Sequence, residues 1–123
     1  MIQTQTIVKI TDNSGAKIGR VFKILGGSKK RTAGIGELVV LSVQKAEPRK
    51  SVKKKAVLHA VVVRQKKPFR RKDGSYIRFD ENSVVIIEKG KKEPIAGRIF
   101  GPIPRELAEL GFQTITSRAP EVV

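Results

Sequence analysis

The sequence predicts a mainly β fold, with a small closed or nearly closed barrel and a short helical segment late in the chain. The apolar residues are mostly Val, Ile and Leu, and β-branched residues favour sheets. They fall into five or six short runs separated by turn residues, whereas a helical pattern occurs only near the C-terminus. Closure into a barrel would remove the exposed edges that so short a sheet otherwise leaves.

The chain is organised around residues 56–87. An apolar run at 56–63 predicts a buried strand, and residues 64–72 follow it with six cations in nine positions. Asp73-Gly74 is a strong hairpin signal, and a second apolar run at 84–87 returns to the core. A buried strand therefore extends into a charged ribbon that folds back on itself. Because the cations of such a ribbon repel one another, we predict that something anionic lies alongside it.

Alternating apolar residues predict three strands before this stretch, at 6–10, 17–25 and 38–45. Residues 12–15 form a turn between the first two, since Asx side chains cap local backbone and Gly accepts positive φ. In the second strand, Ile18, Phe22 and Ile24 are expected to face the core. In the third strand, the residues expected to face inward are Val39, Leu41 and Val43.

The C-terminal part has a different pattern. Residues 94–104 hold three prolines and two glycines, which predicts an irregular but packed segment. Residues 104–111 predict a short helix, since Pro stands in its first turn and Gly just past its end. Leu107 and Leu110 share a face of this helix and can dock on the barrel. Residues 112–117 fit either a strand or a second short helix.

Composition restricts the possible functions. We expect a single domain, residues 1–123, with the helical segment at about 104–123. The chain has no Cys and one His, which excludes disulfides, thiol catalysis and multi-histidine metal sites. No signal peptide is expected from the N-terminal residues, and no apolar run approaches the roughly 20 residues of a membrane span. We therefore expect a soluble protein with no membrane partner, no metal and no cofactor.

Charge is distributed unevenly. The 26 Lys and Arg residues against 11 Asp and Glu give a net charge of +15, which favours polyanionic partners. Residues 1–103 carry a net charge of +16, whereas residues 104–123 carry −1. Three basic loops, at 29–31, 49–55 and 64–72, contain no acid. Because Lys and Arg neutralise phosphates and release counterions, these loops predict binding to nucleic acid, and the C-terminal segment suits protein contact.

The candidate phosphate-binding residues are the cations of these loops and of the returning arm. They are Lys29, Lys30, Arg31, Arg49, Lys50, Lys53, Lys54, Lys55, Arg64, Lys66, Lys67, Arg70, Arg71, Lys72 and Arg78. Arg64, Arg70 and Arg71 are the best candidates for specific geometry, since Arg bonds bidentately and stacks. Asn13 and Ser28 are further candidates from adjoining turns.

The aromatic residues of the ribbon, Phe69 and Tyr76, have two interpretations. Either ring can stack on an unpaired base, or it can pack across the hairpin and hold the ribbon together. We favour packing, because the chain has no Trp and few aromatic residues. This composition favours recognition of the shape and backbone of a folded RNA over a base-stacking platform.

An enzyme is poorly supported. His59 lies in the middle of a predicted strand, with no carboxylate nearby in sequence, and is expected to be structural. Gly34-Ile35-Gly36 is not a dinucleotide loop, because Val39 stands where the third glycine belongs. Asp80-Glu81 is expected to cap a turn or to pair with Arg78 rather than to act as acid and base.

Several short motifs together resemble one known family. They are Asp12-Asn13-Ser14-Gly15-Ala16, Leu25-Gly26-Gly27-Ser28, Ala60-Val61-Val62-Val63-Arg64, Asp73-Gly74-Ser75, Ile77-Arg78-Phe79-Asp80, Arg98-Ile99-Phe100-Gly101-Pro102 and Ala119-Pro120-Glu121-Val122-Val123. In this order and spacing, over essentially the whole chain, the sequence resembles the universal large-subunit ribosomal protein number fourteen in its bacterial and organellar form.

This resemblance implies a five-stranded closed barrel with a projecting β-hairpin ribbon and a C-terminal helical segment. It implies a non-enzymatic constituent of the large subunit, in a bacterium or an organelle, that binds large-subunit rRNA and helps to bridge to small-subunit rRNA. It also implies contact with a neighbouring large-subunit protein (the bacterial one numbered nineteen) and docking of a ribosome-silencing factor. The protein-facing residues would be Arg98, Leu107, Leu110 and Ser117. Ala96-Gly97 and Thr114 depart from the family pattern on that side.

Two rival functions remain open. A free-standing nucleic-acid-binding module, such as an RNA chaperone with a similar barrel, would bind many unrelated single strands. An enzyme acting on RNA would need a base or a metal cluster, and the sequence offers one histidine and scattered acids. A membrane-surface protein would need a basic amphipathic helix, and the predicted helix is not basic.

Overall fold

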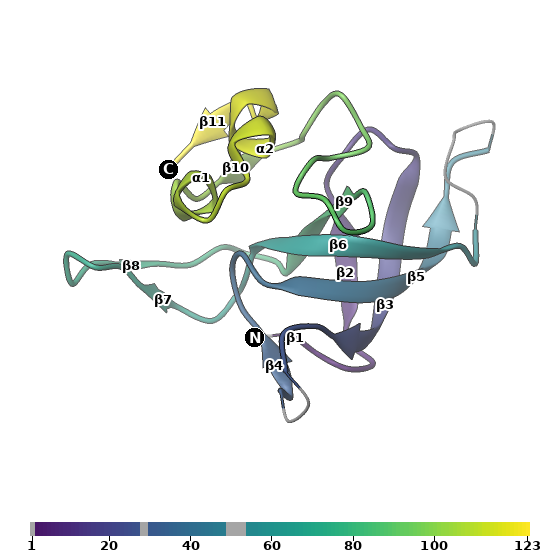
Figure 1. The fold of residues 1–123 in the computed structure, drawn as a ribbon, viewed down its shortest axis with the longest axis horizontal. Helices are drawn as coiled ribbons and strands as arrows, with labels where there is room; N and C mark the ends of the chain where they lie inside the picture. The colour runs from purple at the N-terminus through teal and green to yellow at the C-terminus, as the bar shows by residue number, and fades with distance from the viewer. Residues whose placement is uncertain (1, 28–29, 49–53) are drawn as a thin grey trace.

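The centre of the molecule is a closed barrel of five strands (Figure 1). The computed structural model describes residues 2–27, 30–48 and 54–123. The barrel strands, in their order around it, are β2 (Ile7–Ile10), β3 (Ala16–Ile24), β5 (Leu38–Ala46), β6 (Val57–Arg64) and β9 (Ser83–Ile87). Neighbouring strands run antiparallel, except that β2 and β9 close the barrel as a parallel pair. The predicted mainly β fold and closed five-stranded barrel are confirmed.

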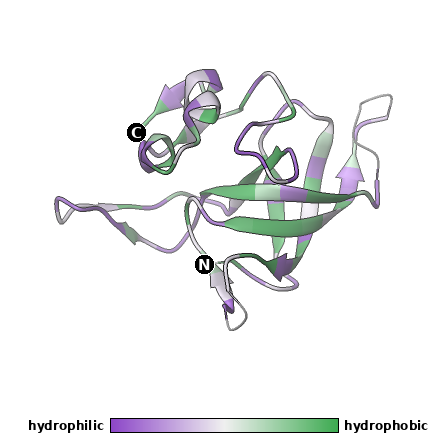
Figure 2. Ribbon diagram, in the orientation of Figure 1, coloured by the Kyte–Doolittle hydropathy of each residue, from purple (hydrophilic) through white to green (hydrophobic). Residues whose placement is uncertain are grey.

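Strand β9, and strand β6 from Ala60 onward, are buried on both faces. Alternate side chains of each strand fill the barrel, and these are Ala60, Val62, Val84 and Ile86. The side chains between them point outward into a second core, and these are Val61, Val63, Val85 and Ile87. Because a strand covered on both sides has no solvent face, both sequences are continuous apolar runs without polar alternation. In Figure 2 the adjoining barrel strands β5 and β6 are mostly green, that is, hydrophobic.

The C-terminal segment supplies the cover for this second core. It contains β10 (Pro102–Ile103), α1 (Glu106–Glu109), α2 (Gln113–Arg118) and β11 (Glu121–Val122), and β10 pairs with β11 in parallel. The side chains that it buries against β6 and β9 are Ile99, Ile103, Leu107, Phe112 and Ile115. A fully buried aliphatic side chain contributes about 1.5–3 kcal/mol, so this layer is held firmly.

Two short two-stranded pieces complete the fold. Strand β1 (Ile2–Gln3) pairs with β4 (Thr32–Ala33), and Ile2 and Ala33 are buried in the barrel core. Strand β7 (Phe69–Arg70) pairs with β8 (Tyr76–Ile77) to form the predicted ribbon. The ribbon projects away from the barrel, on the same side as the C-terminal segment (Figure 1).

The inward face predicted for the second strand is wrong at Ile18 and Phe22. The residues of β3 that are buried are Ala16, Gly19, Val21 and Ile24, whereas Phe22 is 43% exposed. The pairing of β3 with β5 shifts register around residues 16–19 and between Val21 and Lys23. Each extra residue of a bulge reverses the face on which the next side chain lies. The strand β5 prediction is confirmed, since Val39, Leu41 and Val43 are fully buried.

Residues 112–117, for which the sequence allowed a strand or a second short helix, form a helix. Helix α2 spans Gln113–Arg118, and its buried residue Ile115 packs in the second core. Helix α1 covers only Glu106–Glu109 of the predicted 104–111. Gly111, with φ of +98°, separates the two helices in a backbone conformation that favours glycine.

A buried carboxylate completes the closure of the barrel. Strands β2 and β9 pair only at Lys9–Ser83 and Ile10–Val84, so β9 extends beyond its partner. Asp12 Oδ2 accepts a hydrogen bond from the backbone N–H of Ile86 at 3.0 Å and so replaces the missing strand. Asp12 Oδ1 accepts from the N–H and hydroxyl of Ser14, at 3.1 and 2.5 Å. Burial raises the pKa of Asp12, although these hydrogen bonds oppose the shift.

We expect Asp12→Ala to lower the free energy of unfolding by at least about 2 kcal/mol, because buried N–H groups lose their acceptor. Asp12→Asn removes the charge and replaces one of the two acceptor oxygens with an NH2 group, and it cannot titrate. Since the folded-state pKa of Asp12 lies above its ordinary value of 3.8, the stability of the native protein relative to Asp12→Asn should rise as pH falls through that folded-state pKa and should decline again as pH increases. Urea denaturation of both proteins between about pH 7 and pH 4 measures this difference. A difference that stays constant with pH would contradict the assignment.

Candidate nucleic-acid interface

The ribbon is fixed to the barrel at its base. Gln65 is buried; its side chain accepts a hydrogen bond from Ile35 N–H at 3.1 Å and donates to the carbonyl of Lys67 at 2.9 Å. The backbone N–H of Lys66 donates to Asn82 Oδ1 at 3.0 Å on the returning arm. Both arms therefore leave the barrel in defined directions.

The tip of the ribbon is a tight turn. Gly74 has φ of +90°, and its N–H donates to the carbonyl of Arg71 at 3.0 Å. Asp73 Oδ1 accepts from the N–H and hydroxyl of Ser75, at 3.0 and 2.6 Å, and these bonds lower the pKa of Asp73. The Asp-Gly hairpin predicted from the sequence is present, and Ser75 binds the carboxylate at its tip.

Most of the ribbon cations predicted to contact phosphate are exposed. The exposed ones are Lys66, Lys67, Arg70, Lys72 and Arg78. Arg70 pairs with Tyr76 across the ribbon, and the Tyr76 side chain is 67% exposed. Phe69, one residue earlier, packs instead against the second core. Neither interpretation had anticipated this packing of Phe69 against the second core, whereas the exposed ring of Tyr76 is compatible with both.

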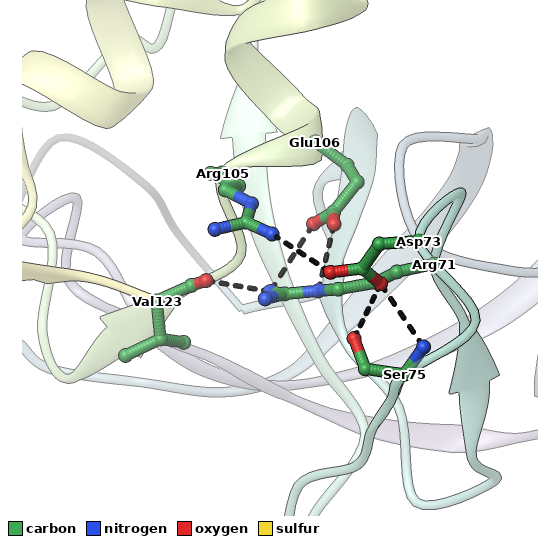
Figure 3. Close-up of polar contacts among 6 residues, drawn as sticks. All are labelled: Arg71, Asp73, Ser75, Arg105, Glu106 and Val123. Atoms are coloured by element: carbon green, nitrogen blue, oxygen red, sulfur yellow. Dashed lines mark hydrogen bonds and ion pairs between the residues drawn. The ribbon is translucent and has the colours of Figure 1, made fainter.

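Arg71 differs from its neighbours, because its guanidinium bonds within the protein (Figure 3). Its Nε lies 2.8 Å from Glu106 Oε1, and its Nη2 donates to the carbonyl of Val123 at 2.5 Å. The side chains of Arg71 and Glu106 are only 13% and 16% exposed. The prediction that Arg71 contacts phosphate requires correction, since its donors point to the C-terminal segment.

Arg64 is also an internal residue. It is 7% exposed; Nη1 donates to Glu81 Oε1 at 2.9 Å, and Nη2 donates to the carbonyl of Phe100. Gly101, at φ of +78°, leaves room for this guanidinium, since a Cβ there would lie 2.5 Å from Arg64 Nη2. Burial lowers the pKa of Arg64, and Glu81 opposes the shift. The phosphate contact predicted for Arg64 is therefore corrected. Arg64 acts as a structural joint, which connects β6 with the base of the ribbon and with the C-terminal segment.

The other two basic loops lie apart from the ribbon. Lys54 and Lys55 are exposed just before β6, and the ribbon leaves the opposite end of this eight-residue strand, roughly 26 Å away. Arg31 is exposed, whereas Lys30 forms an ion pair with Glu37. Asn13 is exposed in the β2–β3 turn. The remaining candidates lie outside the described residues, and they are Ser28, Lys29, Arg49, Lys50 and Lys53.

A groove of about 630 Å³ on the outer face of β2 and β3 was not predicted. Ile7 and Phe100 line it and are 56% and 47% exposed. Its rim carries the ion pairs Lys9–Glu81, at 3.5 Å, and Lys17–Glu47, at 3.6 Å. Its walls come from five separate parts of the chain, so no local pattern could indicate it.

Of the four residues predicted to face a protein partner, three are accessible. Arg98, Leu110 and Ser117 are exposed, and the guanidinium of Arg98 lies 5.8 Å from the centre of the Phe100 ring. Leu107 is fully buried in the second core, so its predicted partner contact is corrected to an internal one. The docking of Leu107 on the barrel is confirmed, whereas the docking predicted for Leu110 is not confirmed, since Leu110 is 47% exposed and does not belong to the second core.

The described residues hold no candidate for two other kinds of site, a metal centre and a membrane-spanning helix. They contain no group of three or more His, Cys, Asp or Glu side chains that could hold a metal ion. His59 lies within β6 opposite Ile87, as a strand residue. None of the helices in this part of the chain is long and apolar enough to cross a membrane.

We expect Arg64→Ala to lower the free energy of unfolding by about 1.5–3 kcal/mol, because a charged group loses buried hydrogen bonds. Arg70→Ala is the matched control, since it truncates an exposed arginine on the same chain segment and should change stability by less than about 0.5 kcal/mol. Urea denaturation of the three proteins gives the comparison. Equal stability of the two variants would show that Arg64 is not a structural joint.

Comparison with known proteins agrees with this architecture. The family model described as ribosomal protein L14p/L23e matches residues 1–123, which is the whole chain. Members of this family are structural proteins of the large ribosomal subunit. A small barrel with basic projections fits such a role. The chain therefore belongs to the ribosomal protein L14p/L23e family.

Proposed function

We propose that the chain binds large-subunit rRNA through the ribbon and the basic turn before β6, and that it contributes to bridges with small-subunit rRNA. The observation that carries the proposal is the concentration of exposed cations on the ribbon. Residues 64–79 contain one acid, Asp73, whose carboxylate is engaged by Ser75 and lies 3.9 Å from Arg105. The ribbon therefore presents an almost purely positive surface, and phosphates are the matching groups.

The ribbon is suited to the backbone and shape of folded RNA. The exposed cations supply phosphate contacts, and Arg70 and Arg78 can bond bidentately. Tyr76 is the exposed aromatic residue of the ribbon, so stacking on an unpaired base would involve one ring. A single ring does not make the platform that binds single strands without sequence preference.

The C-terminal surface supports a second role in protein contact. Its exposed apolar side chains include Ile95, Leu110 and Val122, between 41% and 47% exposed, and Phe100 lies beside Arg98. Residues 104–123 carry a net charge of −1, unlike the rest of the chain. We propose that this side meets neighbouring large-subunit proteins and a ribosome-silencing factor, with Arg98, Leu110 and Ser117 at the contact, in the ribosome of a bacterium or an organelle.

Arg70→Glu tests the rRNA contact. We expect weaker binding to large-subunit rRNA, and a dependence of log Kd on log salt that is less steep by about one unit, because about one phosphate contact is lost. Lys89→Glu, on the exposed turn after β9, makes the same charge change outside the ribbon and should leave the slope unchanged. Titrations with rRNA at several KCl concentrations measure both.

An unchanged slope for Arg70→Glu would contradict the assignment of the ribbon as the rRNA contact. The same titrations address the rival function. Equal affinity of the native protein for many unrelated single strands would favour a free-standing nucleic-acid-binding module.

A further inference from the structure

We infer that Arg71 and Glu106 are positioning residues, which lock the ribbon against the C-terminal segment so that Arg70 and Lys72 are held ready for rRNA. This inference deepens the proposed function and rests on it. According to this inference, the acidic side chain of Glu106 favours the binding of rRNA, although rRNA is itself negatively charged.

The ion pair is nearly shielded from solvent and has three contacts. Arg71 Nε lies 2.8 Å from Glu106 Oε1, and Arg71 Nη2 lies 3.4 Å from Glu106 Oε2. The same Nη2 donates to the carbonyl of Val123 at 2.5 Å. One guanidinium thus joins the ribbon to α1 and to the last residue of the chain, as Figure 3 shows. Nη2 donates hydrogen bonds to both Glu106 and Val123, whereas Nε is close to Glu106 Oε1 without a hydrogen bond, so charge attraction and these two bonds hold the guanidinium in place.

Two further contacts act in the same direction. Arg105 Nη2 lies 3.9 Å from Asp73 Oδ2 at the ribbon tip, opposite in polarity to the Arg71–Glu106 pair. Phe69 packs against the second core, which includes Leu107 of α1. Phe69 and Arg71 therefore contact the C-terminal segment, whereas Arg70, between them, is exposed to solvent.

The ribbon needs this support, because its own pairing is short. Its two strands pair only at Phe69–Ile77 and Arg70–Tyr76. A two-stranded hairpin of this kind is marginally stable by itself in water. A mobile ribbon would lose conformational entropy when it meets RNA, whereas a ribbon already held in place avoids that loss. Arg71 and Glu106 would thus raise the affinity without touching a phosphate.

Positioning by Glu106 and simple charge attraction predict opposite effects of the same substitution. Glu106→Gln removes a negative charge from the protein, so charge attraction alone predicts tighter binding to rRNA. Positioning predicts binding weaker by about three- to tenfold, with an unchanged salt slope, since no phosphate contact is lost. Glu109→Gln is the matched control, because it makes the same charge change at an exposed residue of the same helix, near the same ribbon cations, and should not weaken binding.

The experiment compares the native protein with Glu106→Gln, Glu109→Gln and the exchange variant Arg71→Glu/Glu106→Arg. Affinity and salt slope are measured with large-subunit rRNA, and amide hydrogen exchange is measured on the free proteins. We expect Glu106→Gln to speed exchange of the ribbon amides of Arg71 and Gly74, which donate to Ser75 and Arg71 carbonyls. The exchange variant, which keeps the net charge, should recover protection and affinity.

Tighter binding of Glu106→Gln, equal to that of Glu109→Gln, would overturn the inference. Unchanged protection of the ribbon amides would overturn it as well, and this readout needs no RNA. If the native protein itself fails to bind rRNA, the proposed function is wrong, and so is the positioning of Arg70 and Lys72 for rRNA. The hydrogen-exchange data would still decide whether the ion pair holds the ribbon in place.

Discussion

The structure depends on the burial of the C-terminal segment against the outer face of β6 and β9. A small barrel normally keeps polar side chains on its outside, and here two adjacent strands are apolar on both faces. Val61 and Val85 would lie in water without this cover. Because Leu107 and Ile115 complete the second core, the late helices are part of the fold and not an appendage.

The ribbon takes its position from the same arrangement. The ribbon follows β6 in the chain, and hydrogen bonds and ion pairs fix its direction as it leaves the core. Arg64 bonds to the carbonyl of Phe100, and Arg71 bonds to Glu106 and Val123, so two arginines of the basic stretch join it to the C-terminal segment. The remaining cations lie in solvent. The cations of the stretch that stay exposed, and so can face an anionic partner, are Lys66, Lys67, Arg70 and Lys72.

The sequence predicted most of the fold, because its strong signals are local. The apolar runs of β6 and β9 and the Asp-Gly turn depend on neighbouring residues alone. The face of β3 was wrong at Ile18 and Phe22, since bulges depend on how a partner strand pairs. At the candidate site, the local sequence does not reveal that Arg64 and Arg71 bond within the protein whereas Arg70 is exposed. The partners of Arg64 and Arg71 lie 17 to 52 positions away along the chain. Whether a cation is exposed depends on the tertiary structure around it, and not on its neighbours in the sequence.

The central claim is that the exposed cations of the ribbon meet rRNA. Chemical labelling of lysines, read by mass spectrometry on the free protein and on the protein assembled with large-subunit rRNA, tests it directly. Lys66 and Lys72 on the ribbon should become protected on assembly, whereas Lys89 and Lys91 beyond β9 should stay reactive. Equal labelling of the ribbon lysines in the free and assembled protein would contradict the account.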